Sequence, residues 1–143
     1  MRVLTVNTGS SSVKLRVLDG EDTVLDTTDT EPGEIVAAVQ RLLSDHPVDA
    51  VGHRVVHGGP RHVRPERVDD ALLGDLRELV PLAPLHQPVA VEAIKAVRDA
   101  FPDLSAVACF DTAFHSGLPL SARTYALPSS WNRRWALRRY GFH

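Results

Sequence analysis

The residues best suited to chemistry in this sequence are a run of small hydroxyl side chains followed by a lysine. Asn7-Thr8-Gly9 leads into Ser10, Ser11 and Ser12, and Lys14 comes two residues later. Such a turn can present backbone N–H groups and hydroxyls to phosphate oxygens, and Lys14 adds a compact positive charge. It is not a Walker A loop, because no second glycine precedes the lysine and a strand is expected to follow. An ordinary hairpin turn has the same composition, so both interpretations stay open.

Two further charged residues stand beside the expected ends of strands. Arg54 follows a strand expected at 48–51, and a guanidinium can hold a carboxylate or phosphoryl group through a bidentate pair of hydrogen bonds. Asp111 follows a strand expected at 105–110, and carboxylates at strand ends are typical of α/β active sites. From the local pattern alone, Arg54 could also be a surface residue, and Asp111 could cap the turn that follows it.

The histidines and the single cysteine carry weaker signals. His53 and His57 are four residues apart, but no third ligand is near and no HExxH pattern occurs, so core or hydrogen-bonded histidines are favoured over a zinc site. His86 follows a proline-containing loop at an expected helix start, where capping or packing is the local interpretation. Cys109 lies in an apolar run and is expected to be a buried, inert thiol.

The elements that must position these residues can be predicted from periodicity. Strands are expected at 3–6, 13–17 and 23–25, forming an antiparallel meander, and later at 48–51 and 105–110. Apolar residues at helical spacing predict helices over 35–43 and 72–80, and Pro88 marks the first turn of another that would bury Ala90, Ile94, Val97 and Phe101. The chain after residue 110 is expected to be mostly irregular. This order predicts an α/β fold with a mixed sheet and flanking helices.

The composition of the 143 residues is that of one globular domain, with 43% hydrophobic residues, 24% charged residues and a net charge of −2. This balance predicts no nucleic-acid partner, and the arginine pairs 133–134 and 138–139 are interpreted as a solvated surface. A single cysteine excludes an intrachain disulfide and favours a reducing compartment. No signal peptide or apolar run of about 18 residues is recognised. We therefore expect a cytoplasmic protein without a membrane partner.

Five segments together resemble the acetate kinase family, within the acetate and sugar kinase, Hsp70 and actin superfamily. Val-Asn-Thr-Gly-Ser-Ser-Ser-Val-Lys is similar to the first signature of that family. Gly-His-Arg-Val-Val-His-Gly-Gly, Pro-Leu-Ala-Pro-Leu-His, Phe-Asp-Thr-Ala-Phe-His and Arg-Arg-Tyr-Gly-Phe-His follow in the family's order, at 52–59, 81–86, 110–115 and 138–143. Each segment alone is a weak signal, but five in order across nearly the whole chain are specific.

The resemblance implies an actin-like (ribonuclease H-like) fold and reversible transfer of a phosphoryl group between ATP and acetate, giving acetyl phosphate and ADP with Mg²⁺ as cofactor. It also implies a homodimeric family. The implied roles are metal binding by Asn7, ATP phosphate binding by Ser10, Ser12 and Lys14, substrate binding by Arg54, and catalysis by His86, Asp111 and His143. Gln87 stands where the family usually has Asn.

The role of Asp111 stays open between proton transfer and positioning. A small carboxylic acid has a pKa of about 4 to 5, so the acceptor is already ionised at neutral pH and a base has little to remove. Orienting Arg54 or placing Mg²⁺ is the other interpretation.

By the resemblance, residues 1–143 correspond to the N-terminal domain of such an enzyme, truncated, with the second domain absent. We therefore expect the isolated chain to be inactive. The alternatives are a non-catalytic fragment that binds phosphate or a partner, and a propionate kinase, because one methylene changes discrimination by only about 1 to 3 kcal/mol.

Overall fold

The computed structural model describes residues 1–9, 11–20 and 23–140. Its centre is a six-stranded mixed sheet with the strand order β3-β2-β1-β4-β6-β5. The strands are β1 (Arg2–Thr8), β2 (Val13–Asp19), β3 (Thr23–Thr30), β4 (Ala50–Val55), β5 (Glu66–Arg67) and β6 (Ser105–Phe110). The predicted α/β class and the antiparallel β1-β2-β3 meander are confirmed.

Parallel pairing in the middle of the sheet brings three strands to one edge. β1 pairs in parallel with β4, and β4 pairs in parallel with β6. Asn7 on β1 is therefore the register partner of Arg54, and Arg54 is the partner of Cys109, two residues before Asp111. Residues separated by long stretches of chain meet at the carboxyl ends of neighbouring strands.

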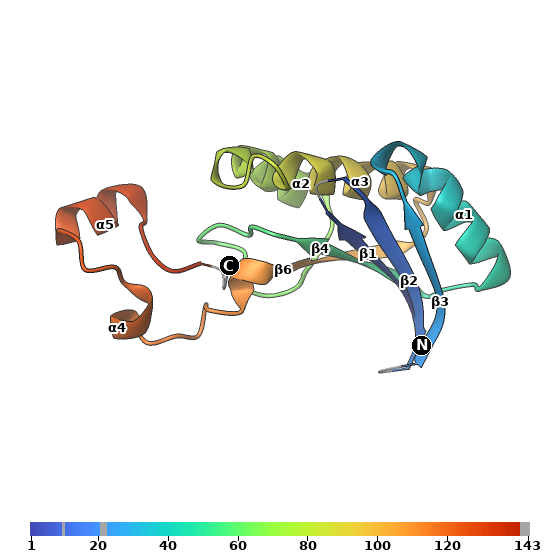
Figure 1. The fold of residues 1–143 in the computed structure, drawn as a ribbon, viewed down its shortest axis with the longest axis horizontal. Coiled ribbons are helices and arrows are strands. Elements are labelled where there is room, and N and C mark those ends of the chain that lie inside the picture. Colours follow the sequence, from blue (N-terminus) through green and yellow to red (C-terminus); the bar gives the residue numbers. More distant parts are fainter. Residues whose placement is uncertain (10, 21–22, 141–143) are drawn as a thin grey trace.

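The long helices all cover the same face of the sheet, and the opposite face is bare (Figure 1). The helical elements are the 3₁₀ turns η1 (Pro32–Glu34), η2 (Val80–Leu82) and η3 (Asp111–Ala113), and the α-helices α1 (Ile35–Asp45), α2 (Asp70–Glu78), α3 (Gln87–Ala100), α4 (Leu120–Arg123) and α5 (Ser129–Trp135). Pro88 lies in the first turn of α3, as predicted. Asp69 caps α2, because its carboxylate accepts a hydrogen bond from the Leu72 N–H at 2.8 Å.

The core lies between the helices and the covered face of the sheet. Alternate residues of β1 and β2 point into it, and Leu4, Val6, Leu15 and Val17 are buried. A second group of buried side chains joins α2 and α3 to β4 and β6, and it consists of Val55, Leu72, Leu73, Leu76, Val91, Ile94, Ala108 and Phe110. The site strands are thus fixed from one side by packed apolar contacts.

Several predicted boundaries were wrong. β3 is longer than the three residues expected, and β4 begins at Ala50 and continues to Val55, so Arg54 lies inside a strand. The strand had been expected to end at residue 51, before Gly52, which lies in the middle of β4. Of the four residues expected to be buried by α3, Phe101 instead follows the helix and is only partly buried.

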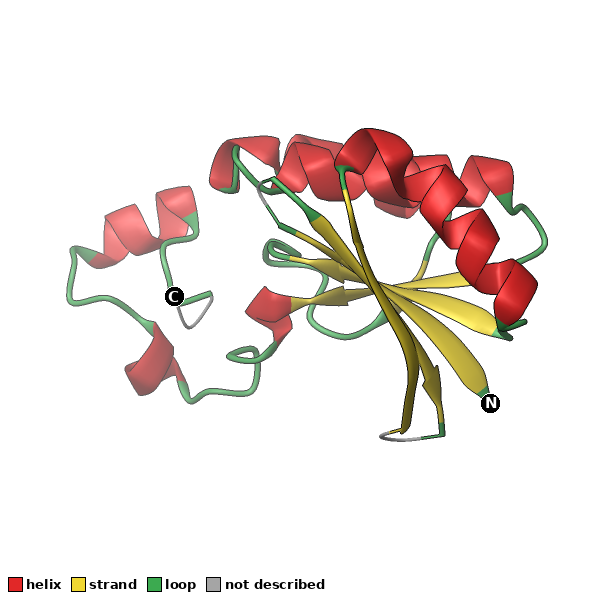
Figure 2. Ribbon diagram, turned by 45° about the vertical axis from the view of Figure 1, so that its right-hand side comes forward, coloured by secondary structure: helices red, strands yellow, loops and turns green. Residues whose placement is uncertain are grey.

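The segment after β6 also differs from the expectation, because it contains α4 and α5 within the stretch predicted to be irregular. This segment projects beyond the end of the sheet that carries β6 and η3 (Figure 2). Within the part of the chain that the structure describes, no helix is long and apolar enough to cross a membrane.

Candidate active site

Arg54, Asp111 and Asn7 form one hydrogen-bonded group where the carboxyl ends of β1, β4 and β6 meet, which we call the sheet edge. The Arg54 Nε–H donates to both carboxylate oxygens of Asp111, at 3.0 and 3.1 Å, and Nη2 donates to Oδ2 at 2.5 Å. The other terminal nitrogen, Nη1, donates to the Asn7 amide oxygen at 2.9 Å. Three strands therefore hold a single guanidinium: β4 carries it, and the residues at the end of β1 and just after β6 fix its plane.

The two charges of this pair differ in exposure. The Arg54 side chain is 38% exposed, whereas that of Asp111 is only 12% exposed. The hydrogen bonds to Asp111 raise the pKa of Arg54, so the guanidinium stays charged. Removal of Arg54 would take away the cation that faces this poorly exposed carboxylate. The Arg54 guanidinium, by contrast, also reaches water.

Some N–H groups of Arg54 are not used by Asp111 or Asn7. A guanidinium has five N–H groups, and the contacts with Asp111 and Asn7 use Nε–H and one N–H on each terminal nitrogen. Among the described residues, these contacts leave one N–H on Nη1 and one on Nη2 unused. Two such donors on one guanidinium can bind the oxygens of a carboxylate or phosphoryl group.

A cavity of about 450 Å³ opens beside this group on the bare face of the sheet. It is lined by Thr5, Val6, Asn7, Lys14, Arg16, Gly52, His53, Arg54 and Cys109. Lys14 is the register partner of Asn7 on β2 and is exposed. The cavity thus has three cationic side chains and no carboxylate among its described lining residues, which favours an anionic ligand.

The turn between β1 and β2 is closed by its own backbone, because the Gly9 N–H donates to the Ser12 carbonyl at 2.8 Å. A Cβ atom at position 9 would lie 3.2 Å from that carbonyl oxygen, which is a tight contact. Ser12 is exposed beside it. Of the other residues expected at the site, Ser10 and His143 lie outside the described residues.

His86 immediately precedes α3, as predicted, and its side chain makes no capping hydrogen bond there. Its neighbour Gln87 is fully buried, and the Gln87 amide nitrogen donates to the carbonyls of His57 at 2.9 Å and Leu76 at 3.4 Å. The residue that departs from the family pattern therefore joins the loop after β4 to α2 and α3. The structure gives it a positioning role in the fold.

The loop after β4 is also joined to the turn that carries Asp111. The buried Thr112 hydroxyl accepts a hydrogen bond from the Gly58 N–H at 2.9 Å. A Cβ atom on Gly58 would come within 2.3 Å of the His62 carbonyl oxygen, so only glycine fits this approach. Thr112 had not been singled out from the sequence, because its partner lies 54 residues away and no local pattern identifies it.

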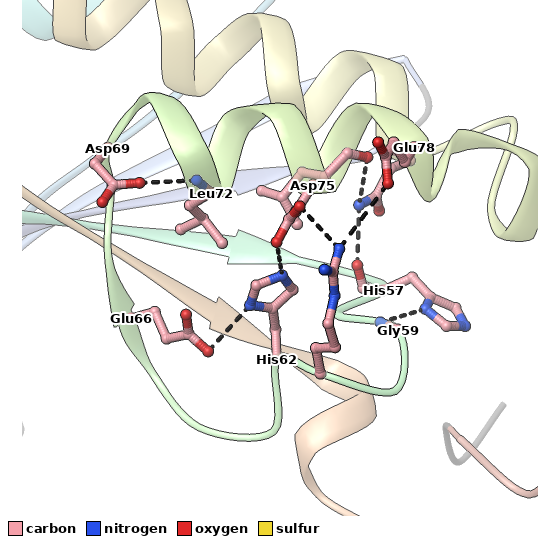
Figure 3. Close-up of polar contacts among 11 residues, drawn as sticks. His57, Gly59, His62, Glu66, Asp69, Leu72, Asp75 and Glu78 are labelled. Atoms are coloured by element: carbon pink, nitrogen blue, oxygen red, sulfur yellow. Dashed lines mark hydrogen bonds and ion pairs between the residues drawn. The ribbon is translucent and has the colours of Figure 1, made fainter.

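A second polar group, which we call the loop clamp, consists of Arg61, His62, Glu66 and Asp75. Figure 3 shows His62 between Glu66 and Asp75. The buried His62 ring lies between two carboxylates, with Nδ1 3.1 Å from Glu66 and Nε2 3.2 Å from Asp75. Arg61 also contacts Asp75, at 2.8 Å. The clamp fixes the loop that follows β4 onto α2.

The two histidines considered for a metal site lie in different environments. His53 is buried in β4, neither ring nitrogen has a hydrogen-bond partner among the described residues, and burial lowers its pKa from 6.5 to about 4. His57 lies in the loop, where its Nδ1 accepts from the Gly59 N–H at 2.8 Å and its ring contacts Tyr140. Burial, and then the charge of Arg138, lower the pKa of His57. No group of three His, Cys, Asp or Glu side chains suited to a metal occurs in the described ranges.

The expected burial of Cys109 was wrong. The thiol is exposed and lines the cavity beside Arg54, because β6 is covered by helices on only one face. Its neighbours Ala108 and Phe110 point to the covered face and are buried. The remaining burial of Cys109 raises its thiol pKa, which lowers its reactivity as a nucleophile.

The family model of the Acetokinase family matches residues 33–143. Acetate kinase from Micrococcus luteus is 42% identical, over 100% of this chain and 42% of that protein. The crystal structure of Porphyromonas gingivalis acetate kinase superposes with a TM-score of 0.83 and 30% identity, over 99% of this chain and 45% of that one. A propionate kinase from Francisella tularensis has a TM-score of 0.85 and 27% identity, with the same coverage.

The fold is shared with acetate and propionate kinases. The chain belongs to the acetokinase family. It spans less than half the length of the relatives that it matches in full.

Proposed function

We propose that this chain supplies the acyl-substrate half of an acetate kinase active site, in which Arg54 binds acetate or the acetyl phosphate formed from it. The observation that carries the proposal is the reserved N–H pair of Arg54, on a guanidinium whose plane is fixed by Asp111 and Asn7. Membership of the acetokinase family supports the same assignment.

The reaction forms a bond between an acetate oxygen and the γ-phosphorus of ATP and breaks the bond from that phosphorus to the β,γ-bridging oxygen, giving acetyl phosphate and ADP. The acetate is already anionic at neutral pH, so no proton has to leave it. Catalysis then consists of positioning and of neutralising charge on the transferred group. Arg54 contributes both, because a bidentate contact fixes orientation and its charge opposes that of the oxygens.

Asp111 is a positioning residue in this proposal. Its carboxylate accepts hydrogen bonds from Nε and Nη2 of Arg54, which fixes the direction of the remaining N–H pair. A general base would need an acceptor proton to remove, and an ionised carboxylate has none. The geometry therefore supports orientation of Arg54 over acid–base catalysis, and His86 and His143 are proposed to act at the reacting centre.

The turn at residues 7–14 is proposed to bind the nucleotide phosphates through Ser10, Ser12 and Lys14. Mg²⁺ prefers oxygen ligands and commonly uses only one or two protein side chains beside substrate phosphates. The Asn7 amide and the Asp111 carboxylate provide such oxygens at this edge of the sheet and could hold the ion. When bound, Mg²⁺ would neutralise phosphate charge. A cytoplasmic location, a place in acetyl-CoA biosynthesis and a homodimeric assembly belong to the same proposal.

Propionate kinase is the second candidate function. It is favoured by the equally good superposition on the Francisella tularensis propionate kinase, at a TM-score of 0.85. The site residues proposed above contact the carboxylate and phosphate, which the two substrates share.

The proposal is tested with two proteins: the 143-residue chain, and a chimera in which it replaces the matched part of Micrococcus luteus acetate kinase. Both are assayed for acyl phosphate formation from acetate or propionate, ATP and Mg²⁺. We expect turnover by the chimera, and none by the isolated chain, because the matched relatives contain more than twice its length. A folded chimera without activity toward either acid would contradict the proposed function, and the ratio of the two rates separates the two candidates.

A further inference from the structure

The segment after Asp111 has an unusual balance of charge. It contains five of the chain's 16 basic residues, and none of its 18 acidic residues. The five arginines are Arg123, Arg133, Arg134, Arg138 and Arg139. Because the whole chain has a net charge of −2, this positive charge is local to the segment that carries α4 and α5.

Part of this charge surrounds a cavity separate from the sheet edge. The cavity has a volume of about 600 Å³ and lies between α4, α5 and the loop that contains Pro60 and Val63. Arg123, Arg133 and Arg138 line it, and no Asp or Glu is among its described lining residues. None of Asn7, Lys14, Arg54 and Asp111 lines this cavity. Its size is within the range of small-molecule sites.

Two guanidinium donors at this cavity have no hydrogen-bond partner in the part of the chain that the structure describes. They are the buried Arg123 Nε and Arg138 Nη1, and the buried Asn132 amide oxygen is likewise without a partner among the described residues. Within the described ranges, the Arg123 side chain donates to the Ser116 carbonyl, through Nη1 at 3.3 Å. Buried guanidinium donors without an acceptor are costly, so a bound anion would stabilise this arrangement.

The carboxylates near the same loop do not neutralise these arginines, because the carboxylates belong to the loop clamp. Glu66 and Asp75 contact His62, and Asp75 also contacts Arg61 (Figure 3). The flanking residues Pro60 and Val63 face the cavity instead. The acidic and basic groups of this region are therefore separated onto two sides of one loop.

We propose that this cavity binds a phosphate group, either free or carried by a nucleotide, at a site separate from the sheet edge. Arg123, Arg133 and Arg138 supply the charge, and the Thr124 hydroxyl in the lining supplies a neutral donor. The bound phosphate connects α4 and α5 to the loop after β4. The inference does not require the kinase activity proposed above.

The test uses the 143-residue chain and the fluorescence of its two tryptophans, Trp131 and Trp135, both of which lie on α5. Orthophosphate, pyrophosphate and ADP are titrated separately at constant ionic strength. We expect saturable binding that Arg123→Gln and Arg133→Gln each weaken at least about tenfold. Arg139→Gln is the matched control, because it removes the same charge from the same segment without lining the cavity.

Saturation by orthophosphate would assign the site to a free phosphate group, and saturation by ADP alone would assign it to a nucleotide; either supports the proposal. Equal losses in Arg123→Gln and Arg139→Gln would show unspecific attraction and overturn it. Loss of binding in Arg54→Gln, with the Arg123 and Arg133 variants unaffected, would move the anion to the sheet edge and also overturn it. Circular dichroism verifies folding, and the exposed Arg133 provides a second variant if Arg123→Gln fails to fold.

Discussion

The Arg54 group (Asn7, Arg54 and Asp111) and the loop clamp both pair cationic side chains with carboxylates. They differ in how many hydrogen-bond donors are left for a ligand. In the clamp, both ring nitrogens of His62 lie within 3.2 Å of carboxylates, and Arg61 contacts Asp75 and, at 3.9 Å, Glu78. In the Arg54 group, the carboxylate is nearly buried while the guanidinium keeps two N–H groups beside a cavity. Ion pairing alone therefore does not identify a functional site. A fixed charge with donors in reserve is the more specific signal.

Replacing Arg54 should have the largest effect on activity. In the active chimera, we expect Arg54→Ala to lower kcat/KM for the acyl substrate about 100- to 1,000-fold, because an aligned charged donor is lost at the reacting centre. Steady-state kinetics with acetate varied would measure this. Arg61→Ala is the matched control and should leave kcat/KM within about twofold, since Arg61 lies in the clamp. Equal losses of kcat/KM in the two variants would contradict the assignment of Arg54 to substrate binding and of Arg61 to structure.

The buried His53 should make the stability of the protein depend on pH. His53 has a pKa of about 4 in the folded chain against 6.5 when exposed, so the unfolded state binds its proton first. The free energy of unfolding should therefore decrease as pH falls from about 6.5 to about 4, by about 3 kcal/mol from this group, and by about 2 kcal/mol of that between pH 7 and pH 5. Urea unfolding of the wild type and of His53→Leu at pH 7 and pH 5 would measure the latter change. A wild-type pH dependence that His53→Leu leaves unchanged would exclude His53 as its source.

Breaking the loop clamp should lower the free energy of unfolding and have little effect on turnover. His62→Ala removes a buried ring between Glu66 and Asp75, and we expect it to lower the free energy of unfolding by about 1 to 3 kcal/mol. His46→Ala, which removes only a 3.8 Å contact with Asp26, should change it by less than about 1 kcal/mol. Thermal and urea unfolding of both variants provide the comparison. A larger loss in His46→Ala would contradict the structural role given to the clamp.

Much of the fold could be predicted from the sequence, because one face of the sheet is packed by helices and imposes clear periodicity. The strand at 105–110 and the start of α3 near Pro88 are examples. The errors have physical causes. Gly52 concealed the continuation of β4, and the apolar run around Cys109 suggested burial on both faces, although helices cover only one.

The site was predicted as a set of residues and not as an arrangement. Arg54 and Asp111 were both singled out, but the contact between them spans 57 positions and depends on parallel pairing of β4 with β6. The Asn7 contact depends in the same way on the register between β1 and β4. No local pattern contains this information. The reserved N–H pair of Arg54 could be recognised only once its partners were known.

The most direct test of the central claim is the kinetics of Asp111→Asn in the active chimera, with acetate titrations, Mg²⁺ titrations and pH–rate curves beside those of the parent. If Asp111 orients Arg54 or helps to hold Mg²⁺, the substitution should raise KM for acetate or weaken apparent Mg²⁺ affinity as turnover falls. The acidic limb of the profile should persist. Unchanged acetate and Mg²⁺ titrations, with turnover lower by about two to four decades and the acidic limb gone, would contradict positioning and establish Asp111 as a general base.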